Sequence, residues 1–395
     1  MERIGIYGGA FNPPHLGHVR GAKYALQALG LTRLLMIPTC VSPHKDSPPD
    51  SPEPGQRLHM LRLAIQDEER IEVSALEVSR GGTSYTFETL DALRERNPGA
   101  EFVLLMGTDM FLSFESWKQA DRIQSGCTLA VFYRGEKEEA EKIAAHKQKL
   151  ERSGAVIELV KNPVTEISST QLRRLLVFGG ADSFLPPQVA AYIRKNGLYG
   201  TGKDYRDLPM EQLEQVVVSL LKPSRVKHVL GVRDTAEKLA ILYGADPVDA
   251  ARAGLLHDVT KALDGPLQLT LCHEYGKVLD KFSCQNPKTL HALTGSLVAD
   301  RIFGENPAVV DAIRSHTTGK ANMNLLQKIV YVADYMEPNR DFPGVEKLRE
   351  LAFRDIDQAL MLGLRMTLEI LKERGSEISP ESREALEYLE QSQKG

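Results

Sequence analysis

The spacing of apolar and polar residues divides the chain into two parts of different character. In the first 200 residues, short apolar runs alternate with segments whose apolar residues recur at helical spacing. This alternation predicts an α/β domain with a doubly wound, mostly parallel sheet and helices on both of its faces. Ligands of such sheets bind beyond the carboxyl ends of the strands. We expect strands over residues 3–7, 33–38, 71–75, 102–106, 128–132 and 155–160.

From residue 208 onward, the apolar residues follow a period of 3.6 residues, which predicts an all-α domain. A short polar stretch with two glycines, residues 199–205, separates the two patterns. We therefore expect one domain over residues 1–200 and another over residues 206–395. The helices expected in the second domain cover residues 208–221, 224–243, 247–260, 289–303, 307–316, 323–336, 345–373 and 380–391.

Composition and charge narrow the class of protein. The chain has 395 residues, of which 42% are apolar and 26% charged, as is typical of a soluble globular protein. No apolar run approaches the ~18 residues that span a bilayer, and the first strand leaves no room for a signal segment, so we expect a cytoplasmic protein without a membrane partner. The net charge of −4, without a basic excess in either half, favours small anionic ligands over a nucleic acid polymer. Four scattered cysteines indicate neither a disulfide framework nor a thiolate zinc site.

The most informative stretch follows the first expected strand and reads GGAFNPPHLGH over residues 8–18. Gly8 and Gly9 let the backbone pass close to a nucleotide, and the helix that follows presents free N–H groups to an anion. His15 and His18 lie three residues apart and can point at the same phosphate. Neither familiar glycine-rich phosphate motif is present in this stretch. The pattern closely resembles the G-x-F-x-P-x-H-x-G-H signature of the nucleotidyltransferase superfamily, with Phe11 at the aromatic position.

Polar segments at the ends of the second and third strands allow two interpretations each. Lys45, in a proline-rich loop, is either a phosphate-binding cation or a solvated lysine. The segment that contains Ser84, Tyr85 and Thr86 begins a helix, so its hydroxyl and N–H groups either cap the helix or hold a ligand carboxylate.

The fourth strand and the last helices of this domain add three more candidates. Asp109, which follows Gly107 at a strand end, suits a ribose hydroxyl or a metal bound to phosphate. Trp117, the only tryptophan, belongs either to a ligand site or to the core. A last helix begins with residues that either cap it or form a polyphosphate clamp, namely Ser168, Ser169, Thr170 and Arg173.

In this order and setting, the segments over about residues 1–200 resemble the bacterial nicotinate-mononucleotide adenylyltransferases. The resemblance implies a Rossmann-like fold and the transfer of AMP from ATP to nicotinate mononucleotide, with Mg²⁺ on ATP. It implies that Tyr85, Thr86 and Trp117 bind the nicotinate nucleotide. Nicotinamide mononucleotide and pantetheine phosphate are alternative acceptors. The charges implied to act in catalysis are His15, His18, Lys45 and Arg173, and the residues implied to bind ATP are Gly8, Gly9, Phe11, Gly107, Asp109, Ser168, Ser169 and Thr170.

Histidines and aspartates are the informative residues of the helical half. Asp334 stands within the apolar stretch 329–335, where a carboxylate is costly unless a cation compensates it. The pair His257 and Asp258 follows another apolar run. Drawn from five expected helices, six such residues can converge on one site, and they suit two cations with nitrogen and oxygen ligands. Core histidines and helix caps are the alternative interpretation. The six candidate ligands are His228, His257, Asp258, His291, His316 and Asp334.

This order of residues resembles the HD superfamily of metal-dependent phosphohydrolases. Segments 254–261, 315–319 and 331–340 look like the symmetrical diadenosine-tetraphosphate hydrolases, over about residues 206–390. The resemblance implies cleavage of diadenosine tetraphosphate into two ADP, with Lys261 offsetting charge on the phosphate. It suggests iron, with Mn, Mg or Co as alternatives. We therefore expect a bifunctional enzyme; the alternatives for the helical half are a nucleotidase and a non-catalytic module that binds nucleotides or forms a homo-oligomer.

Overall fold

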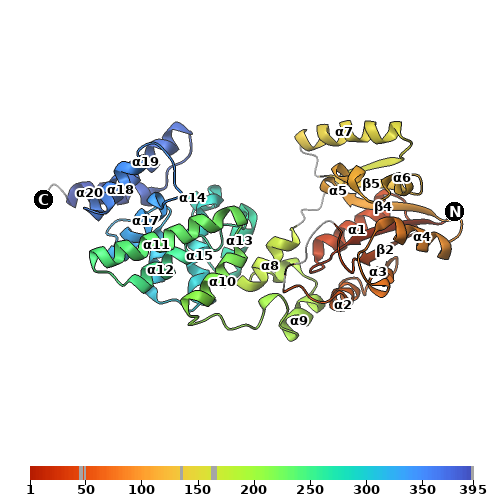
Figure 1. Ribbon diagram of the computed structural model, residues 1–395, viewed down its shortest axis with the longest axis horizontal. Coiled ribbons are helices and arrows are strands. Elements are labelled where there is room, and N and C mark those ends of the chain that lie inside the picture. Colours follow the sequence, from red (N-terminus) through yellow and green to blue (C-terminus); the bar gives the residue numbers. More distant parts are fainter. Residues whose placement is uncertain (44–47, 49, 134–136, 162–166, 393–395) are drawn as a thin grey trace. The chain divides into compact units, whose positions relative to one another are not determined.

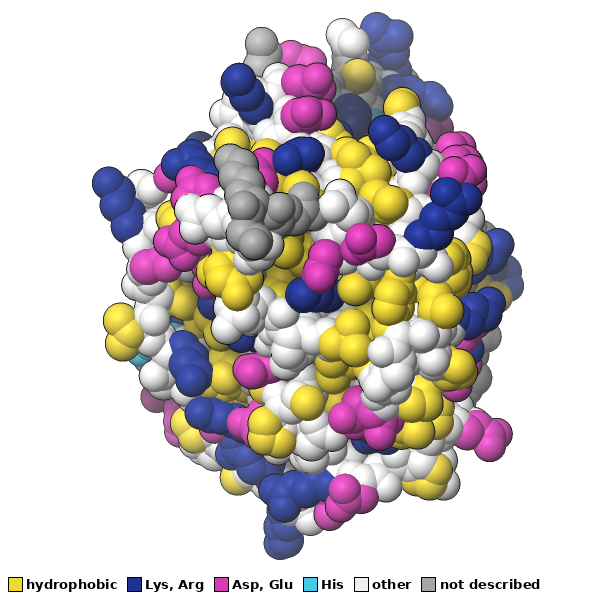
Figure 2. All heavy atoms as spheres, turned by 90° about the vertical axis from the view of Figure 1, so that its left-hand side faces the viewer, with side chains coloured by type: hydrophobic (Ala, Val, Ile, Leu, Met, Phe, Trp, Pro, Cys, Tyr) yellow, Lys and Arg dark blue, Asp and Glu magenta, His cyan; other side chains and the backbone are white. Residues whose placement is uncertain are grey.

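The computed structural model describes residues 1–43, 48, 50–133, 137–161 and 167–392 (Figure 1). The chain divides into two compact units, Met1–Lys203 and Asp204–Gly395. Among the described residues, no helix combines the length and the apolar character that crossing a bilayer requires. On the face drawn in Figure 2, acidic, basic and apolar side chains are interspersed.

A six-stranded parallel sheet forms the centre of the first unit. Its strand order is β3-β2-β1-β4-β5-β6, so β1 lies between β2 and β4 and the direction of winding reverses there. The predicted doubly wound parallel sheet is confirmed, as are its six strands. Their bounds are β1 (Arg3–Gly9), β2 (Arg33–Pro38), β3 (Ile71–Val73), β4 (Glu101–Gly107), β5 (Thr128–Tyr133) and β6 (Ile157–Lys161).

Alternate residues of the strands face two separate hydrophobic cores. Leu35 and Leu104 point into one core, and their neighbours Leu34 and Val103 point into the other. Helices α4, α5, α6 and α7 contribute to the first core, and α1 and α2 to the second. The helices of this unit are α1 (Leu16–Ala28), α2 (Pro54–Ala64), α3 (Leu76–Arg80), α4 (Thr86–Arg96), α5 (Thr108–Leu112), α6 (Ala120–Gln124), α7 (Lys137–Arg152), α8 (Ser169–Phe178) and α9 (Pro187–Lys195), with short 3-10 turns η1 (Phe114–Ser116), η2 (Asp182–Phe184) and η3 (Leu198–Gly200).

The second unit is all-α, as predicted, since residues 204–392 are all described and contain no strand. Helices α11, α12, α16 and α17 pack against one another and form its centre. Its helices are α10 (Met210–Leu220), α11 (Val226–Tyr243), α12 (Pro247–Leu256), α13 (Gly265–Glu274), α14 (Lys281–Gln285), α15 (Leu290–Arg301), α16 (Pro307–Ser315), α17 (Leu325–Met336), α18 (Val345–Ala352), α19 (Ile356–Glu373) and α20 (Pro380–Ser392), with 3-10 turns η4 (Pro223–Arg225) and η5 (Pro287–Thr289).

The prediction of a single helix over residues 345–373 is wrong. It is two helices, because Asp355 adopts an extended backbone and its side chain accepts hydrogen bonds from the N–H groups of Asp357 and Gln358. Helices α13 and α14 were not expected. The helix expected over residues 247–260 ends at Leu256, so His257 and Asp258 lie in the turn that follows it.

Candidate active sites

The ends of β1 and β4 present open backbone at the point where the winding of the sheet reverses. A Cβ atom added at Gly8 or Gly107 would meet no atom within 4 Å. At Gly9, it would lie 3.4 Å from the buried ring of Phe11. Asp109 is exposed in the first turn of α5, beside Gly107. These residues leave room for a ligand to contact the backbone directly.

The two histidines of the opening loop fix each other's orientation. The N–H group of His18 donates to Nδ1 of His15 at 3.4 Å, the N–H group of His15 donates to Nδ1 of His18 at 3.2 Å, and the rings stack with centroids 3.6 Å apart. Because each Nδ1 atom accepts, the proton of each neutral ring lies on Nε2. Burial lowers the pKa of His15 to about 4 and that of His18 well below its usual value. Both rings therefore offer an Nε2–H donor to an anion.

The start of α8 lies against the same loop. Arg173 donates to the carbonyl of Asn12 at 2.8 Å and to Oγ1 of Thr170 at 3.1 Å. Ser168 caps the helix by accepting from the N–H group of Gln171, while the neighbouring Ser169 begins α8. The structure thus brings the predicted clamp to the loop that carries the histidines.

Two buried residues that the sequence did not reveal hold this loop in place. Arg57 of α2 donates to the carbonyls of Ala10 and Thr39, each at 2.7 Å, and so joins the ends of β1 and β2. The hydroxyl of Tyr199 donates to Oδ1 of Asn12 at 2.7 Å. Arg57 stands among the buried positions of α2, near Met60. A charged residue at such a position is the signal by which the sequence could have revealed its role.

The residues predicted to bind the nicotinate nucleotide lie on the side of the sheet that α4 covers. Tyr85, just before α4, and Trp117, just after η1, pack against the same hydrophobic core, and Nζ of Lys118 lies 4.1 Å from the centre of the Tyr85 ring. Thr86 is half-buried at the first position of α4. Lys45 lies outside the described residues.

In the second unit, all six predicted ligands converge; they are called here the His–Asp cluster. One group has Nε2 of His228 at 3.3 Å from Nε2 of His257 and at 3.1 Å from Oδ1 of Asp334. In the other, the Nε2 atoms of His291 and His316 are 3.2 Å apart.

Asp258 lies between the two groups. Its Oδ2 atom is 3.4 Å from Nε2 of His257, and its Oδ1 atom is 3.4 Å from Nε2 of His291. Its pKa is held well below the usual range: burial opposes ionisation, but His257 beside it outweighs that effect. One carboxylate thus faces both groups, with one oxygen toward each.

Backbone carbonyls orient three imidazoles of the cluster. The Nδ1 atoms of His257, His291 and His316 lie 2.6, 2.8 and 2.7 Å from the backbone carbonyls of Gly254, Lys288 and Ile313. Carbonyls only accept, so each Nδ1 atom carries a proton, and the lone pair of each neutral ring lies on the Nε2 atom that faces the cluster. Oδ1 of Asp258 is buried without a hydrogen-bond partner. Converging lone pairs and an unsatisfied carboxylate oxygen fit divalent cations with nitrogen and oxygen ligands.

The Nδ1 atom of His228 also has an acceptor, the carboxylate of Glu337. This residue was not selected from the sequence. Its Oε1 atom is 3.1 Å from Nδ1 of His228, and its Oε2 atom accepts from the backbone and side chain of Asn339, each at 2.7 Å. A Cβ atom at Gly231 would lie 2.3 Å from Oε2, so this buried carboxylate needs a glycine there. The fourth imidazole is thus oriented by a carboxylate.

Three cationic side chains border the His–Asp cluster. Nζ of Lys261 lies 2.8 Å from Nε2 of His291, and burial lowers the pKa of this lysine. Arg225 donates to Oδ2 of Asp258 at 2.6 Å, and Arg340 donates to Oδ1 of Asp334 at 2.6 Å. Sequence reasoning selected Lys261 but missed Arg225. The cluster thus has cations placed to attract a polyphosphate.

Comparisons with known proteins match both units. The cytidylyltransferase-like family matches residues 6–175, and the HD domain family matches residues 225–339. A probable nicotinate-nucleotide adenylyltransferase of Pelobacter propionicus is 34% identical and aligns with 50% of this chain and 98% of its own. A symmetrical bis(5'-nucleosyl)-tetraphosphatase of Halalkalibacterium halodurans is 40% identical, with coverages of 42% and 90%.

A third relative contains both parts in one chain. It is a Mycoplasma pneumoniae protein named a probable nicotinate-nucleotide adenylyltransferase/Ap4A hydrolase, 27% identical over 93% of this chain and 99% of its own. The two resemblances expected from the sequence are therefore confirmed. The chain belongs to the nicotinate-nucleotide adenylyltransferases through its first unit and to the HD-domain symmetrical bis(5'-nucleosyl)-tetraphosphatases through its second.

Proposed function

We propose that the first unit transfers the adenylyl group of ATP to nicotinate mononucleotide and forms deamido-NAD and pyrophosphate. The phosphate oxygen of the acceptor attacks the α-phosphorus, and the bond from that phosphorus to the β-phosphate oxygen breaks. The Nε2–H groups of His15 and His18 donate to the α-phosphate oxygens, where charge builds up. The observation that carries this role is their reciprocal Nδ1 bonding, which leaves both donors available. No side chain serves as a nucleophile, because placement and charge suffice for this reaction.

The leaving pyrophosphate is held at the start of α8. The β- and γ-phosphates bind to Ser169, Thr170 and Arg173. The rest of the ATP molecule contacts Gly8, Gly107 and Asp109. Support comes from the bond between Arg173 and the carbonyl of Asn12, which fixes the guanidinium on the opening loop. Mg²⁺ bound to ATP supplies further positive charge.

The identity of the acceptor is tested by product analysis. Tyr85, Thr86 and Trp117 bind the nicotinate ring and its carboxylate, so we expect kcat/KM for nicotinate mononucleotide to exceed that for nicotinamide mononucleotide by at least about 100-fold, as in sites built to bind one polar group. Thr86→Val should reduce this ratio, whereas Thr83→Val, at an exposed position before the segment, should not. Equal rates with both acceptors would refute the assignment.

For the second unit, the proposed reaction is hydrolysis of diadenosine tetraphosphate to two ADP. The observation that carries it is the position of Asp258 between two groups of imidazoles, one carboxylate oxygen toward each. Two divalent cations, iron being our assignment, would be held by the side chains of the His–Asp cluster and would lower the pKa of a water molecule. In the hydrolysis, water adds to one of the two inner phosphorus atoms, and the bond from that phosphorus to the oxygen that bridges them breaks. Lys261, Arg225 and Arg340 neutralise the phosphate charge that builds up.

The experiment loads the intact chain with Fe²⁺ or Mn²⁺ and follows the products from diadenosine tetraphosphate. We expect ADP alone, a loss of activity with a chelator, and a loss of activity in Asp258→Ala. A mixture of AMP and ATP would show that cleavage is not symmetrical. A metal-loaded sample that releases no product would favour a module that binds nucleotides without turnover.

A further inference from the structure

A buried chain of hydrogen bonds joins the opening loop of the first unit to the segment that precedes α4. It begins at the backbone carbonyl of Ala10, which accepts from Arg57 at 2.7 Å. The same guanidinium donates to the carbonyl of Thr39 at 2.7 Å and to that of Cys40 at 3.0 Å. Arg57 is 4% exposed, and a charged donor shielded from water makes strong hydrogen bonds, so residues 39 and 40 are fixed against the opening loop.

Ser84 extends this chain to the segment before α4. Its hydroxyl oxygen accepts from the N–H group of Cys40 at 3.0 Å, and its own N–H group donates to the carbonyl of Val41 at 2.9 Å. Ser84 is 5% exposed, and no side chain of the described residues caps α4. The Ser84 hydroxyl is therefore bound to the backbone that follows β2. The path from Ala10 through Arg57 and residues 39–41 to Ser84 is called here the bridging chain.

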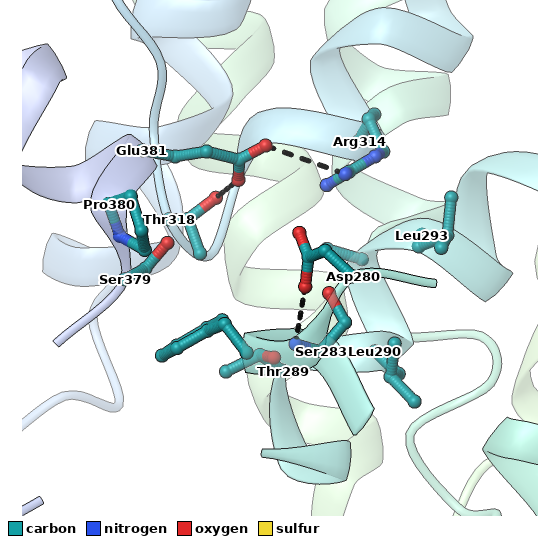
Figure 3. Close-up of a pocket in the computed structure, with 12 residues that line it drawn as sticks. Asp280, Ser283, Thr289, Leu290, Leu293, Arg314, Thr318, Ser379, Pro380 and Glu381 are labelled. Atoms are coloured by element: carbon teal, nitrogen blue, oxygen red, sulfur yellow. Dashed lines mark hydrogen bonds and ion pairs between the residues drawn. The ribbon is translucent and has the colours of Figure 1, made fainter. Parts of the chain in front are cut away.

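The bridging chain differs in reach from other polar contacts of the protein, such as those around a small pocket in the second unit. Residues of α14, α15, α16 and α20 line this pocket of about 70 Å³ (Figure 3). There, Glu381 contacts Arg314 at 3.5 Å and accepts from Thr318 at 2.7 Å, while Asp280 accepts from the N–H group of Ser283 at 2.7 Å. These contacts satisfy polar groups of the pocket itself, whereas the bridging chain links two segments that the proposed function assigns to different reactants.

The two ends of the bridging chain lie beside the two reactants of the proposed transfer. One end is in the loop 8–18, which holds the α-phosphate of ATP, and the other adjoins residues 85 and 86, which bind the mononucleotide. In-line attack requires the acceptor phosphate to approach the α-phosphorus along a fixed line, and a misplacement of about 1 Å can cost about 100-fold in rate. We propose that Arg57 and Ser84 are positioning residues that set the mononucleotide against the α-phosphate. This inference rests on the proposed adenylyl transfer.

The first test asks whether loss of the chain slows transfer to two acceptors alike. Ser84→Ala removes the acceptor of the Cys40 N–H group, and Thr83→Val, at an exposed position, is the matched control. We expect kcat in Ser84→Ala to fall about 10- to 100-fold with nicotinate mononucleotide and by the same factor with nicotinamide mononucleotide, with KM for ATP unchanged, because alignment is lost and binding is not. A loss with the nicotinate acceptor alone would make Ser84 a ligand of the carboxylate, and an unchanged kcat would make it a packing residue; either result would overturn the inference.

A double-variant cycle tests whether Arg57 and Ser84 act in one chain. Arg57→Lys keeps the charge, but an ammonium group cannot reproduce the fork that reaches carbonyls on both sides of it. We expect the protein with both Arg57→Lys and Ser84→Ala to be no more than about twofold slower than the slower single variant, since either change breaks the same chain. Losses that multiply would contradict a shared chain and overturn the inference.

Hydrogen exchange of the full-length protein without substrates separates this inference from the proposed function. Ser84→Ala should increase the exchange rate of backbone N–H groups in residues 8–18 by about fivefold or more, because the opening loop loses support from the far end of the chain, and Thr83→Val should not. Equal exchange in Ser84→Ala and the wild type would overturn the inference. The proposed transfer fails separately, if the wild type releases no pyrophosphate from ATP with either mononucleotide.

Discussion

The atom that faces Nδ1 of each histidine decides what that histidine can bind, and the two units use opposite arrangements. In the first unit, Nδ1 of His15 and of His18 accepts a backbone N–H group, so Nε2 donates and suits phosphate. In the second, Nδ1 of His257 and of His316 faces a carbonyl, so the lone pair of the neutral ring lies on Nε2 and suits a cation. One residue type is thus arranged to bind an anion in the first unit and a cation in the second.

A first prediction concerns protons taken up with ATP. Burial lowers the pKa of His15 to about 4, and a phosphate at Nε2 raises it toward or above ~6.5, because the anion favours the imidazolium. At a pH between these two pKa values, the ATP complex holds more protons than the free protein. The contribution of His15 to ATP affinity therefore increases as the pH falls. We expect net proton uptake at about pH 6, measured by calorimetry in buffers of different ionisation enthalpy.

The comparison that isolates this proton is between two histidine variants of the first unit. His15→Gln should lose the uptake, while His59→Gln, at an exposed position on α2, should keep it. Equal uptake in His15→Gln and the wild type would assign the proton to another group.

A second prediction concerns Glu337, which contacts Nδ1 of His228. Glu337→Gln keeps the shape but places an amide between His228 and the donors of Asn339, so one of these bonds is lost. We expect metal affinity to fall about 10- to 100-fold, with hydrolysis largely restored at saturating metal. Glu346→Gln, whose parent side chain is 77% exposed, is the control. The test is a metal titration in which hydrolysis is the readout. Equal metal affinity in Glu337→Gln and Glu346→Gln would contradict the role of Glu337.

Residue types alone could predict the six members of the His–Asp cluster but not the residues that support them. Asp334 stood out because a carboxylate in an apolar stretch needs a partner. Glu337, Arg57 and Arg225 resemble ordinary charged residues of helices and loops, which are mostly solvated. Their roles depend on backbone atoms and side chains distant in the sequence, such as the carbonyl of Ala10 for Arg57, and only the fold brings these together.

At the scale of elements, the strands could be predicted and some helix ends could not. Central strands such as β2 and β4 are buried on both faces, so each forms a continuous apolar run between polar segments. The break at Asp355 could not be read from spacing, since the apolar residues of α18 and α19 continue one period across it. The many charged residues of helix α7 are typical of a solvated helix, but Ile143 and Leu150 within it are buried in the core. Its apolar stripe is narrow, and the many charged residues around it make the stripe hard to recognise in the sequence.

The packing of α11 on α12 gives a third prediction. A Cβ atom at Gly254 would lie 2.9 Å from the Cα atom of Arg233 and 3.1 Å from the carbonyl oxygen of Val232, and backbone cannot yield as a side chain can. Gly254→Ala should therefore separate the helix that carries His228 from the helix that precedes His257. We expect a loss of about 1–3 kcal/mol in the free energy of unfolding, together with weaker metal binding.

The control is a second helical glycine with space around it. At Gly363 of α19 the added Cβ would lie 3.5 Å from the nearest atom, on Tyr331, which is an ordinary contact. Gly363→Ala should be neutral or stabilising by up to about 1 kcal/mol, since alanine favours helix. Thermal unfolding and metal analysis of both variants provide the test, and a Gly254→Ala protein as stable and as rich in metal as Gly363→Ala would contradict it.

At the scale of the whole molecule, each unit has a hydrophobic interior and a candidate site of its own, and the proposed chemistry links the two sites. Adenylyl transfer needs an acceptor that ends in a phosphate, and the γ-phosphate of a second ATP is such an acceptor. Transfer to it gives diadenosine tetraphosphate and pyrophosphate, the same kind of bond exchange as with nicotinate mononucleotide. Under the proposed function, the second unit hydrolyses this side product to two ADP, and we propose that the fusion joins an adenylyltransferase to the hydrolase that removes its side product.

A fourth prediction follows from this link and uses one variant in each unit. With ATP and Mg²⁺ but no nicotinate mononucleotide, Asp258→Ala should accumulate diadenosine tetraphosphate, because Asp258 faces both groups of the His–Asp cluster and its loss stops hydrolysis. The wild type, supplied with the metal of the second unit, should instead accumulate ADP. His18→Ala should form neither, since it removes a donor to the α-phosphate while leaving the second unit intact. Chromatography of the nucleotides separates these outcomes, and an Asp258→Ala protein that forms deamido-NAD normally yet never makes the dinucleotide would show that the hydrolase acts on substrates from another source.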